Sequence, residues 1–343
     1  MGARMRKTDG KSWAAVMFIS VLASIATAVP AAADDTQGEL SATDAVVAVQ
    51  EVASQSNTGP IEEAETFTVE SDGSRAVVGK GTKVAIEAGN SPTITLESEI
   101  YEPLHVNGGL EGEVEVTSDG TSVYETKQNY SVVPLPYKDG SIQLINVIAD
   151  SAAPERYEYD FSSTTPVSIT LKDGVAVILD VNGDFIGGVT APWAYDAHGV
   201  AVPTHFEIAG STLIQVVEHS SGSYTYPISA DPYLGQKLFS WITVDSYQGD
   251  SRVNLQPTDF GRGMPPWVMT GAGWTEAVGW GGPVPVGPIL GSKATLRQQF
   301  DCHAFGNAFA GTWNLERFRP NRTTVWSFGV AIHHCNWTTA NQY

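Results

Sequence analysis

Positive charge is scarce in this sequence. Its 343 residues include 19 Lys and Arg against 38 Asp and Glu, a formal net charge of −19. Because binding to phosphates needs a basic surface, this balance argues against nucleic acid as a partner. The hydrophobic content of 42% excludes disorder throughout the chain, and the length predicts about two domains.

Catalytic motifs are also lacking. The sequence has no Gly-x-Ser-x-Gly element, which leaves an α/β-hydrolase unsupported, and it has neither a glycine-rich phosphate loop nor a His-Glu-x-x-His helix. Gly249-Asp250-Ser251 resembles the nucleophile block of some esterases, but the Asp-x-x-His that such enzymes need late in the chain is missing. The motifs therefore assign no reaction, and no cofactor is expected.

The N-terminus has the features of a secretory signal. Four basic residues between positions 4 and 11 precede an apolar run over 13–29, and Pro30 introduces three alanines. This pattern predicts a signal peptide over 1–33 and a mature chain that begins near Asp34. The alternative is an uncleaved anchor, although about 17 residues is the short limit for spanning a bilayer. We expect a protein that is secreted, extracellular or loosely associated with the cell wall, with no stable membrane insertion after cleavage.

Two parts of unlike composition follow the signal. Residues 34–235 contain 7 Lys and Arg against 31 Asp and Glu, a net of about −24, whereas residues 236–343 contain 8 against 6, about +2. Seven of the nine tryptophans lie beyond residue 235. We expect a short helix and polar linker over 34–64, an acidic β-rich domain over 65–235 and a Trp-rich domain over 236–343.

Short strand-like runs separated by turn signals predict that the acidic part is almost entirely β. After a helix at about 43–54, with an apolar stripe at Val46, Val47, Val49 and Val52, strands are expected at 114–116, 142–148, 168–171, 175–179, 185–189, 204–208 and 212–217. Turns are expected at 172–174 and at Asn182-Gly183, the second with positive φ at two positions. The predicted fold is mostly β, an antiparallel sandwich or barrel followed by a small disulfide-bonded domain that is β-rich or α+β.

Two groups of oxygen and nitrogen side chains in the acidic part are weighed as metal sites. Asp180, Asn182 and Asp184 alternate as calcium ligands do, but Phe185 and Ala191 occupy the positions that a helix-loop-helix calcium loop fills with Gly and Glu. A hairpin explains them better. The second group is equally well explained as exposed strand positions: His198, His205, Glu207, Glu218 and His219.

Cys302 and Cys335 are the two cysteines of the chain. In an exported protein an even pair is expected to form a disulfide. Zinc is the alternative, because His303 adjoins the first cysteine and His333 and His334 precede the second. Spacing argues against zinc, since adjacent residues of a strand point to opposite faces and ligand pairs are usually two or more residues apart.

Two resemblances follow from longer motifs. The run Ala191-Pro-Trp-Ala-Tyr-Asp-Ala-His-Gly-Val-Ala-Val-Pro-Thr-His205, with 213–219 and 226–232, resembles a β-rich region of secreted actinobacterial proteins of unknown function, which implies a carrier or stalk. Leu296-Arg-Gln-Gln-Phe-Asp-Cys-His303, Trp313-Asn-Leu-Glu-Arg-Phe-Arg-Pro320 and Cys335-Asn336 are similar to the actinobacterial domain of unknown function 2599. This similarity implies a small secreted module held by the Cys302–Cys335 disulfide.

The Trp-rich part contains the predicted ligand-binding residues. Trp267, Trp274 and Trp280 lie in a Gly- and Pro-rich stretch, 261–291, that is expected to form surface loops, where indoles can stack on sugars or on apolar partner surfaces. The alternative is that they fill a core poor in aliphatic residues. Asn314, Arg317 and Arg319 are further ligand candidates, with both arginines expected on one strand face and Glu316 on the other. An internal Glu–Arg ion pair is the plainer alternative.

Function is predicted as recognition without catalysis. The partner expected is a glycan of the cell wall or a surface protein, and the protein is expected to be a monomer. The alternative is an exported effector or toxin with a small hydrolase or nuclease at its C-terminus, whose acid-base candidates are Asp301, His303, Glu316, His333 and His334. A structural wall protein without a discrete ligand is a third alternative, favoured if all seven C-terminal tryptophans are buried.

Overall fold

The computed structural model describes residues 40–55, 58–309, 311–324 and 334–341, and residues 39–343 belong to one compact unit. The predicted signal segment, Trp326 and His333 lie outside the described residues. Two large antiparallel sheets and one small one account for the strands of the described chain. The mostly β fold is therefore confirmed. The domain boundary at residues 235 and 236, which falls between β18 (Tyr233–Gly235) and β19 (Phe239–Tyr247), stays a prediction.

The first helix begins where the sequence predicts it. In α1 (Ala42–Val52) the hydroxyl of Ser41 accepts a hydrogen bond from the backbone N–H of Asp44, 3.2 Å away, which caps the first turn. Val46, Val49 and Val52 are buried, but Val47 points to solvent and is 45% exposed. Six of the eleven residues of α1 share the buried side, and at about 100° per residue Val47 falls on the opposite side, so the predicted stripe is one valine too wide.

The first large sheet has eight strands in the order β1-β2-β3-β4-β5-β10-β16-β15. Its inward residues, such as Leu96, Phe161 and Leu213, pack against the second sheet in one buried cluster. The strands are β1 (Thr68–Val69), β2 (Arg75–Gly79), β3 (Thr82–Ile86), β4 (Ile94–Ser98), β5 (Leu104–Asn107), β10 (Arg156–Ser162), β15 (Thr204–Ala209) and β16 (Thr212–Val217).

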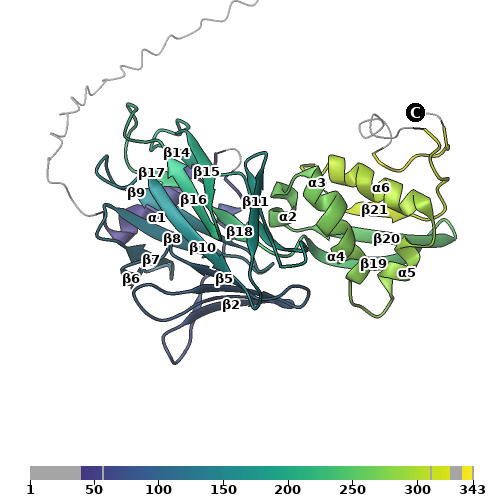
Figure 1. Cartoon of the computed structure of the whole chain (residues 1–343), viewed down its shortest axis with the longest axis horizontal. Helices are drawn as coiled ribbons and strands as arrows, with labels where there is room; N and C mark the ends of the chain where they lie inside the picture. The colour runs from purple at the N-terminus through teal and green to yellow at the C-terminus, as the bar shows by residue number, and fades with distance from the viewer. Residues whose placement is uncertain (1–39, 56–57, 310, 325–333, 342–343) are drawn as a thin grey trace, which may run out of the picture. The chain divides into compact units, whose positions relative to one another are not determined.

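The second large sheet is buried on both faces near its middle. In β9 every residue is buried: Leu144 and Ile148 face the first sheet, while Ile145 and Val147 face α1. Figure 1 shows α1 lying over this sheet. The strands are β6 (Glu113–Val116), β7 (Ser122–Glu125), β8 (Tyr130–Pro136), β9 (Ile142–Ile148), β11 (Ser168–Lys172), β12 (Val175–Leu179), β13 (Phe185–Val189), β14 (Ala194–Tyr195), β17 (Ile228–Ala230) and β18 (Tyr233–Gly235).

Both predicted hairpin turns are present, but the second differs in type from the prediction. The turn with two residues at positive φ is Asp173-Gly174, at 55° and 79°, between β11 and β12. In the next hairpin only Gly183 has positive φ, because the Asp180 carboxylate accepts the backbone N–H groups of Asn182 and Asp184 at 2.8 and 2.9 Å and holds a longer loop. Asp180 thus serves the turn.

The C-terminal part combines strands and helices, as the α+β alternative predicts. A three-stranded sheet, β19 (Phe239–Tyr247), β20 (Asp250–Pro257) and β21 (Trp313–Glu316), is accompanied by helices (Figure 1). Cys302 on the last helix bonds to Cys335, so the predicted disulfide is confirmed. The helices are α2 (Asp259–Gly263), α3 (Pro266–Val268), a π-helical turn (Met269–Gly273), α4 (Trp274–Gly279), α5 (Val286–Leu290) and α6 (Ala294–Phe305).

The prediction of surface loops over 261–291 is wrong. Most of this stretch is helical, and its glycines permit close packing that a side chain would block. A Cβ at Gly261 would collide with the carbonyl of Leu238, and one at Gly287 would lie 2.6 Å from the carbonyl of Val278. Proline stands at the start of α3, where its missing N–H costs nothing.

One buried cluster joins the outer face of the second sheet to the C-terminal helices. Tyr233 on β18 meets the ring of Phe260 on α2 edge to face, with centroids 6.0 Å apart. Gly235, two residues further on, leaves room for the same ring, because a Cβ there would lie 2.6 Å from it. The acidic part and the Trp-rich part therefore share a core.

Replacing Phe260 by alanine is expected to lower the free energy of unfolding by about 3–5 kcal/mol, because a fully buried ring at this junction is lost. Urea unfolding followed by circular dichroism measures the change. Phe309→Ala is the matched control: Phe309 is 74% exposed, and a change below about 0.5 kcal/mol is expected. Equal changes in the two variants would contradict the shared core.

Candidate ligand-binding cleft

A cleft of about 1000 Å³ lies where the acidic part meets α3 and α4. One wall comes from the turn after β2, the loop between β4 and β5, and the β12–β13 hairpin. The other comes from α3, the π-helical turn and α4, with Lys237 and Ser240 beside them. Its volume is within the usual range for small-ligand sites. The aromatic side chains of the lining are Tyr101, Phe185, Trp267 and Trp280.

Two of the three predicted tryptophans line this cleft. Trp267 lies on α3 and Trp280 ends α4, and both are half-buried. An ammonium group stands over each ring: Lys172 Nζ is 5.1 Å from the centroid of Trp267, and Lys237 Nζ is 5.2 Å from that of Trp280. These cation–π contacts hold the indoles in place.

The wall opposite the tryptophans is also aromatic. Tyr101 and Phe185 meet edge to face, with centroids 5.5 Å apart. Around them the lining contains the carboxyl groups of Glu99, Glu102, Asp180 and Asp184, together with the ammonium group of Lys80. The cleft thus has apolar ring faces in its walls and hydrogen-bonding side chains beside them.

Glu276 connects the two walls. Its carboxylate accepts hydrogen bonds from Tyr101 Oη at 2.9 Å, from the backbone N–H of Leu238 at 2.9 Å and from that of Phe239 at 3.0 Å. The side chain is 2% exposed, and this burial raises the pKa of Glu276 to about 7. A helix of the Trp-rich part is thereby tied to a loop of the acidic part.

Trp274 does not line the cleft. Its ring packs edge to face on Phe300, with centroids 5.1 Å apart, and the guanidinium of Arg297 stands 4.8 Å above it. Of the other C-terminal tryptophans that the structure describes, Trp313 and Trp337 are buried and Trp241 is 38% exposed. The condition for a purely structural protein, burial of all the tryptophans, is therefore not met.

The polar residues of the last strand serve internal contacts. Arg319 Nε is 2.6 Å from the buried carboxylate of Glu316, which confirms the predicted alternative of an internal ion pair. Arg317 pairs instead with Asp250 at 2.8 Å, because β21 ends at Glu316 and strand alternation does not continue. Asn314 lies in β21 opposite Asn254. Neither arginine nor Asn314 lines the cleft.

The acid-base candidates each make separate contacts and do not form one site. Asp301 forms an ion pair with Arg297 at 2.7 Å. His303 stacks on Trp313, and burial lowers its pKa to about 4, while its Nε2 has no hydrogen-bond partner among the described residues. His334 is exposed, and His333 is outside the described chain. No hydrogen bond within the described residues links Asp301, His303 and Glu316 to one another, so the geometry adds no support to a hydrolase or nuclease.

The metal candidates of the acidic part converge only partly. The two ring nitrogens of His205 have different partners: Nε2 is 3.6 Å from a carboxylate oxygen of Glu207, and Nδ1 is 3.6 Å from one of Glu218. His219 is buried instead, with Nδ1 at 3.0 Å from Tyr226 Oη. No group of three His, Cys, Asp or Glu side chains that could hold a metal ion is found in the part of the chain that the structure describes.

Residues 239–338 match the model of a family described as a protein of unknown function, DUF2599. The resemblance predicted for the C-terminal part is thus confirmed, over 100 of the 343 residues. Searches of curated proteins and of solved structures found no match. The resemblance of the upstream region stays a prediction. The match begins with β19, so it contains the tryptophan wall of the cleft but not the wall with Tyr101 and Phe185.

Three cleft residues were not identified as such from the sequence: Tyr101, Phe185 and Glu276. Tyr101 and Phe185 are remote from the tryptophans along the chain, and no local pattern brings them together. Glu276 had one signal that could have been used. It is the only acidic residue between Asp259 and Asp301, in a segment rich in Gly and Trp, and a lone carboxylate in such surroundings suggests burial.

The pKa of Glu276 predicts how stability depends on pH. Its folded value, about 7, exceeds the usual 4.5, so the folded state binds the proton more tightly. Protonation of Glu276 stabilises the folded state fully below about pH 4.5. This contribution to the free energy of unfolding, about 3 kcal/mol, is lost as the pH rises through 7. Urea unfolding at several pH values between 4.5 and 8 measures this fall.

Glu276→Gln serves as the reference, because glutamine has a similar shape and does not ionise. The difference in free energy of unfolding between the two proteins should change by about 3 kcal/mol over the pH range, while effects of groups common to both, such as Asp231, cancel. A difference that stays constant with pH would show that Glu276 is not the titrating group.

Proposed function

We propose that this protein is a non-enzymatic recognition protein of the cell surface, and that it binds a glycan of the cell wall in the cleft between the acidic part and α3–α4. The observation that carries this proposal is the pair of half-buried indoles, Trp267 and Trp280, that line a cleft of about 1000 Å³ together with Tyr101 and Phe185. Recognition by this cleft also needs the acidic part, which supplies one of its walls.

The chemistry of a sugar ring suits this lining. A pyranose has flat C–H faces and an edge of hydroxyl groups, so it needs apolar surfaces together with donors and acceptors. Aromatic rings supply the apolar surfaces at low cost in conformational entropy. The hydrogen-bond acceptors are carboxylates such as those of Glu99 and Asp184, and the ammonium group of Lys80 is a donor.

The indole N–H of Trp267 gives further support. It is buried and has no hydrogen-bond partner among the described residues, although Trp267 lines the cleft. An unpaired buried donor costs about 1–3 kcal/mol, which a hydroxyl oxygen of a ligand can offset.

The state of Glu276 favours recognition over acid-base chemistry. Both of its oxygens already accept hydrogen bonds, one from Phe239 and the other from Leu238 and Tyr101. Three of its about four acceptor positions are taken by internal donors, so this carboxylate is suited to fixing the walls of the cleft.

We further propose that the chain is exported and acts as a monomer outside the cell or loosely bound to the wall. The disulfide between Cys302 and Cys335 supports an oxidising compartment, as does the signal-like N-terminal sequence. Among the described residues no helix is long and apolar enough to cross a membrane. The acidic surface makes nucleic acid an unfavourable partner.

Co-sedimentation with insoluble peptidoglycan and with reference polysaccharides tests the proposal. The purified protein is expected to pellet with the wall glycan, and Trp267→Ala or Trp280→Ala should weaken binding about tenfold or more, because a central aromatic contact is removed. Trp241→Ala is the matched control: Trp241 lies on β19, is 38% exposed and does not line the cleft.

Unchanged binding in both cleft variants, with circular dichroism spectra like that of the parent protein, would contradict the cleft as the site. Failure of the parent protein to pellet with any wall glycan would contradict the proposed function itself.

A further inference from the structure

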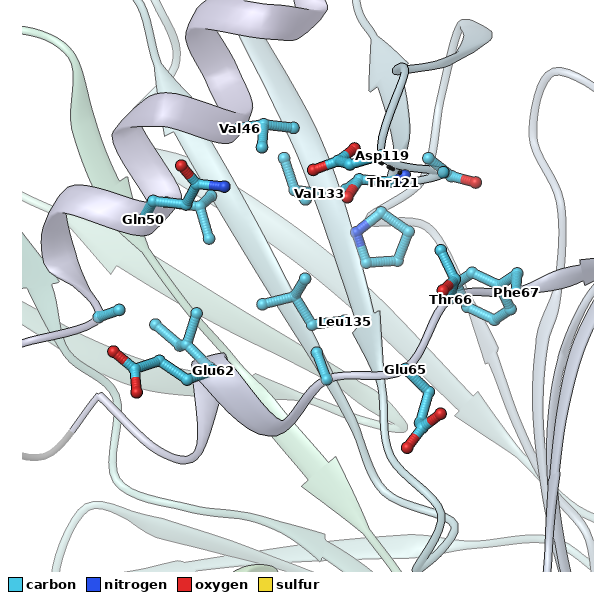
Figure 2. A pocket seen from close by; sticks show the side chains of 17 residues that line it. Val46, Gln50, Glu62, Glu65, Thr66, Phe67, Asp119, Thr121, Val133 and Leu135 are labelled. Atoms are coloured by element: carbon cyan, nitrogen blue, oxygen red, sulfur yellow. Dashed lines mark hydrogen bonds between the residues drawn. The ribbon is translucent and has the colours of Figure 1, made fainter.

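A second cavity, of about 440 Å³, lies beside α1 and shares no lining residue with the cleft. Figure 2 shows α1 on one side of it, with Val133 and Leu135 of β8 in its floor. Val46 and Val49 of α1 add to the apolar lining, and Phe67 lies at one end (Figure 2). The cavity exists because α1 covers the second sheet only in part and the chain at 61–67 crosses beside the helix.

The charged side chains that line this cavity are all acidic. Glu62, Glu65 and Asp119 line it, and its lining contains no Lys, Arg or His (Figure 2). Glu65 is balanced by Lys138, whose Nζ is 2.7 Å away. Glu62 and Asp119 form no ion pair within the described residues, so at least two negative charges stay uncompensated at the rim.

Asp119 is held in the ionised form. Its Oδ1 accepts hydrogen bonds from Thr117 Oγ1 at 2.5 Å and from the backbone N–H of Thr121 at 3.2 Å. The hydrogen bond with Thr117 is the largest cause that lowers the pKa of Asp119. The carboxylate is thereby fixed at the mouth of the cavity with its charge in place.

The acidic part as a whole is also negatively charged. Residues 34–235, which include every lining residue of this cavity, have a net charge of about −24 from 7 basic and 31 acidic side chains. A surface of one sign raises the local concentration of ions of the opposite sign. An anionic ligand is therefore repelled, and a neutral apolar ligand gains nothing from the rim.

We propose that the cavity beside α1 binds an organic cation with an apolar body, the body resting on Val133 and Leu135 and the cationic group lying at the rim, where Glu62 and Asp119 stand on opposite sides (Figure 2). The volume suits a small ligand with one apolar chain or ring. This site is independent of the glycan cleft, and its test does not depend on the proposed function.

Three probes of equal chain length separate the contributions of charge and apolar area: octylammonium, octanoate and 1-octanol. Each is titrated into the full protein labelled with ¹³C at Val and Leu methyl groups. Octylammonium is expected to shift the methyl signals of Val46, Val133 and Leu135, octanol to bind more weakly and octanoate not to bind. Salt should weaken the binding of octylammonium and leave that of octanol unchanged.

The double variant Glu62→Gln with Asp119→Asn is expected to lower the affinity for octylammonium about threefold to tenfold, since exposed charge pairs contribute modestly. The affinity for octanol should not change. Glu51→Gln is the matched control, because Glu51 is an exposed acid of α1 that does not line this cavity. Equal binding of octylammonium and octanoate, shifts confined to other methyl groups, or no shift with octylammonium would each overturn the proposal.

Discussion

The buried carboxylate of Glu276 is the contact on which the cleft depends. It joins α4, the backbone at Leu238 and Phe239, and Tyr101 from a loop 175 residues earlier. A charge removed from water is unfavourable unless several donors compensate it, and this one has three. Because the same contact fixes Tyr101 against α4, the stability of the protein and the spacing of the cleft walls have a common origin.

Apolar packing also joins the acidic part to the Trp-rich part. The second sheet buries both faces, one against the first sheet and the other against α1 and the C-terminal helices. Phe260 fits against Tyr233 because Gly235 carries no side chain. Two parts that differ strongly in charge thus form one compact unit, and the family match to residues 239–338 covers only one wall of the resulting cleft.

Local patterns predicted seven of the 21 strands in the described chain, but not the contacts between distant segments. Short apolar runs identified β9 and β12, the first helix formed close to its predicted position, and an even pair of cysteines formed the disulfide. The glycines near Gly261 were interpreted as loop residues, although they allow helices to approach the backbone of Leu238. Tyr101 and Glu276 meet only through the tertiary fold, which a one-dimensional pattern does not contain.

Fluorine NMR of the protein labelled with 5-fluorotryptophan, titrated with soluble oligosaccharides of the cell wall, tests the central claim most directly. Each indole gives its own resonance, which single Trp→Phe variants assign. The account predicts that the signals of Trp267 and Trp280 shift on binding, while those of Trp313 and Trp337, buried in the fold, do not. Binding that leaves the Trp267 and Trp280 signals unchanged, or no response to any wall oligosaccharide, would contradict it.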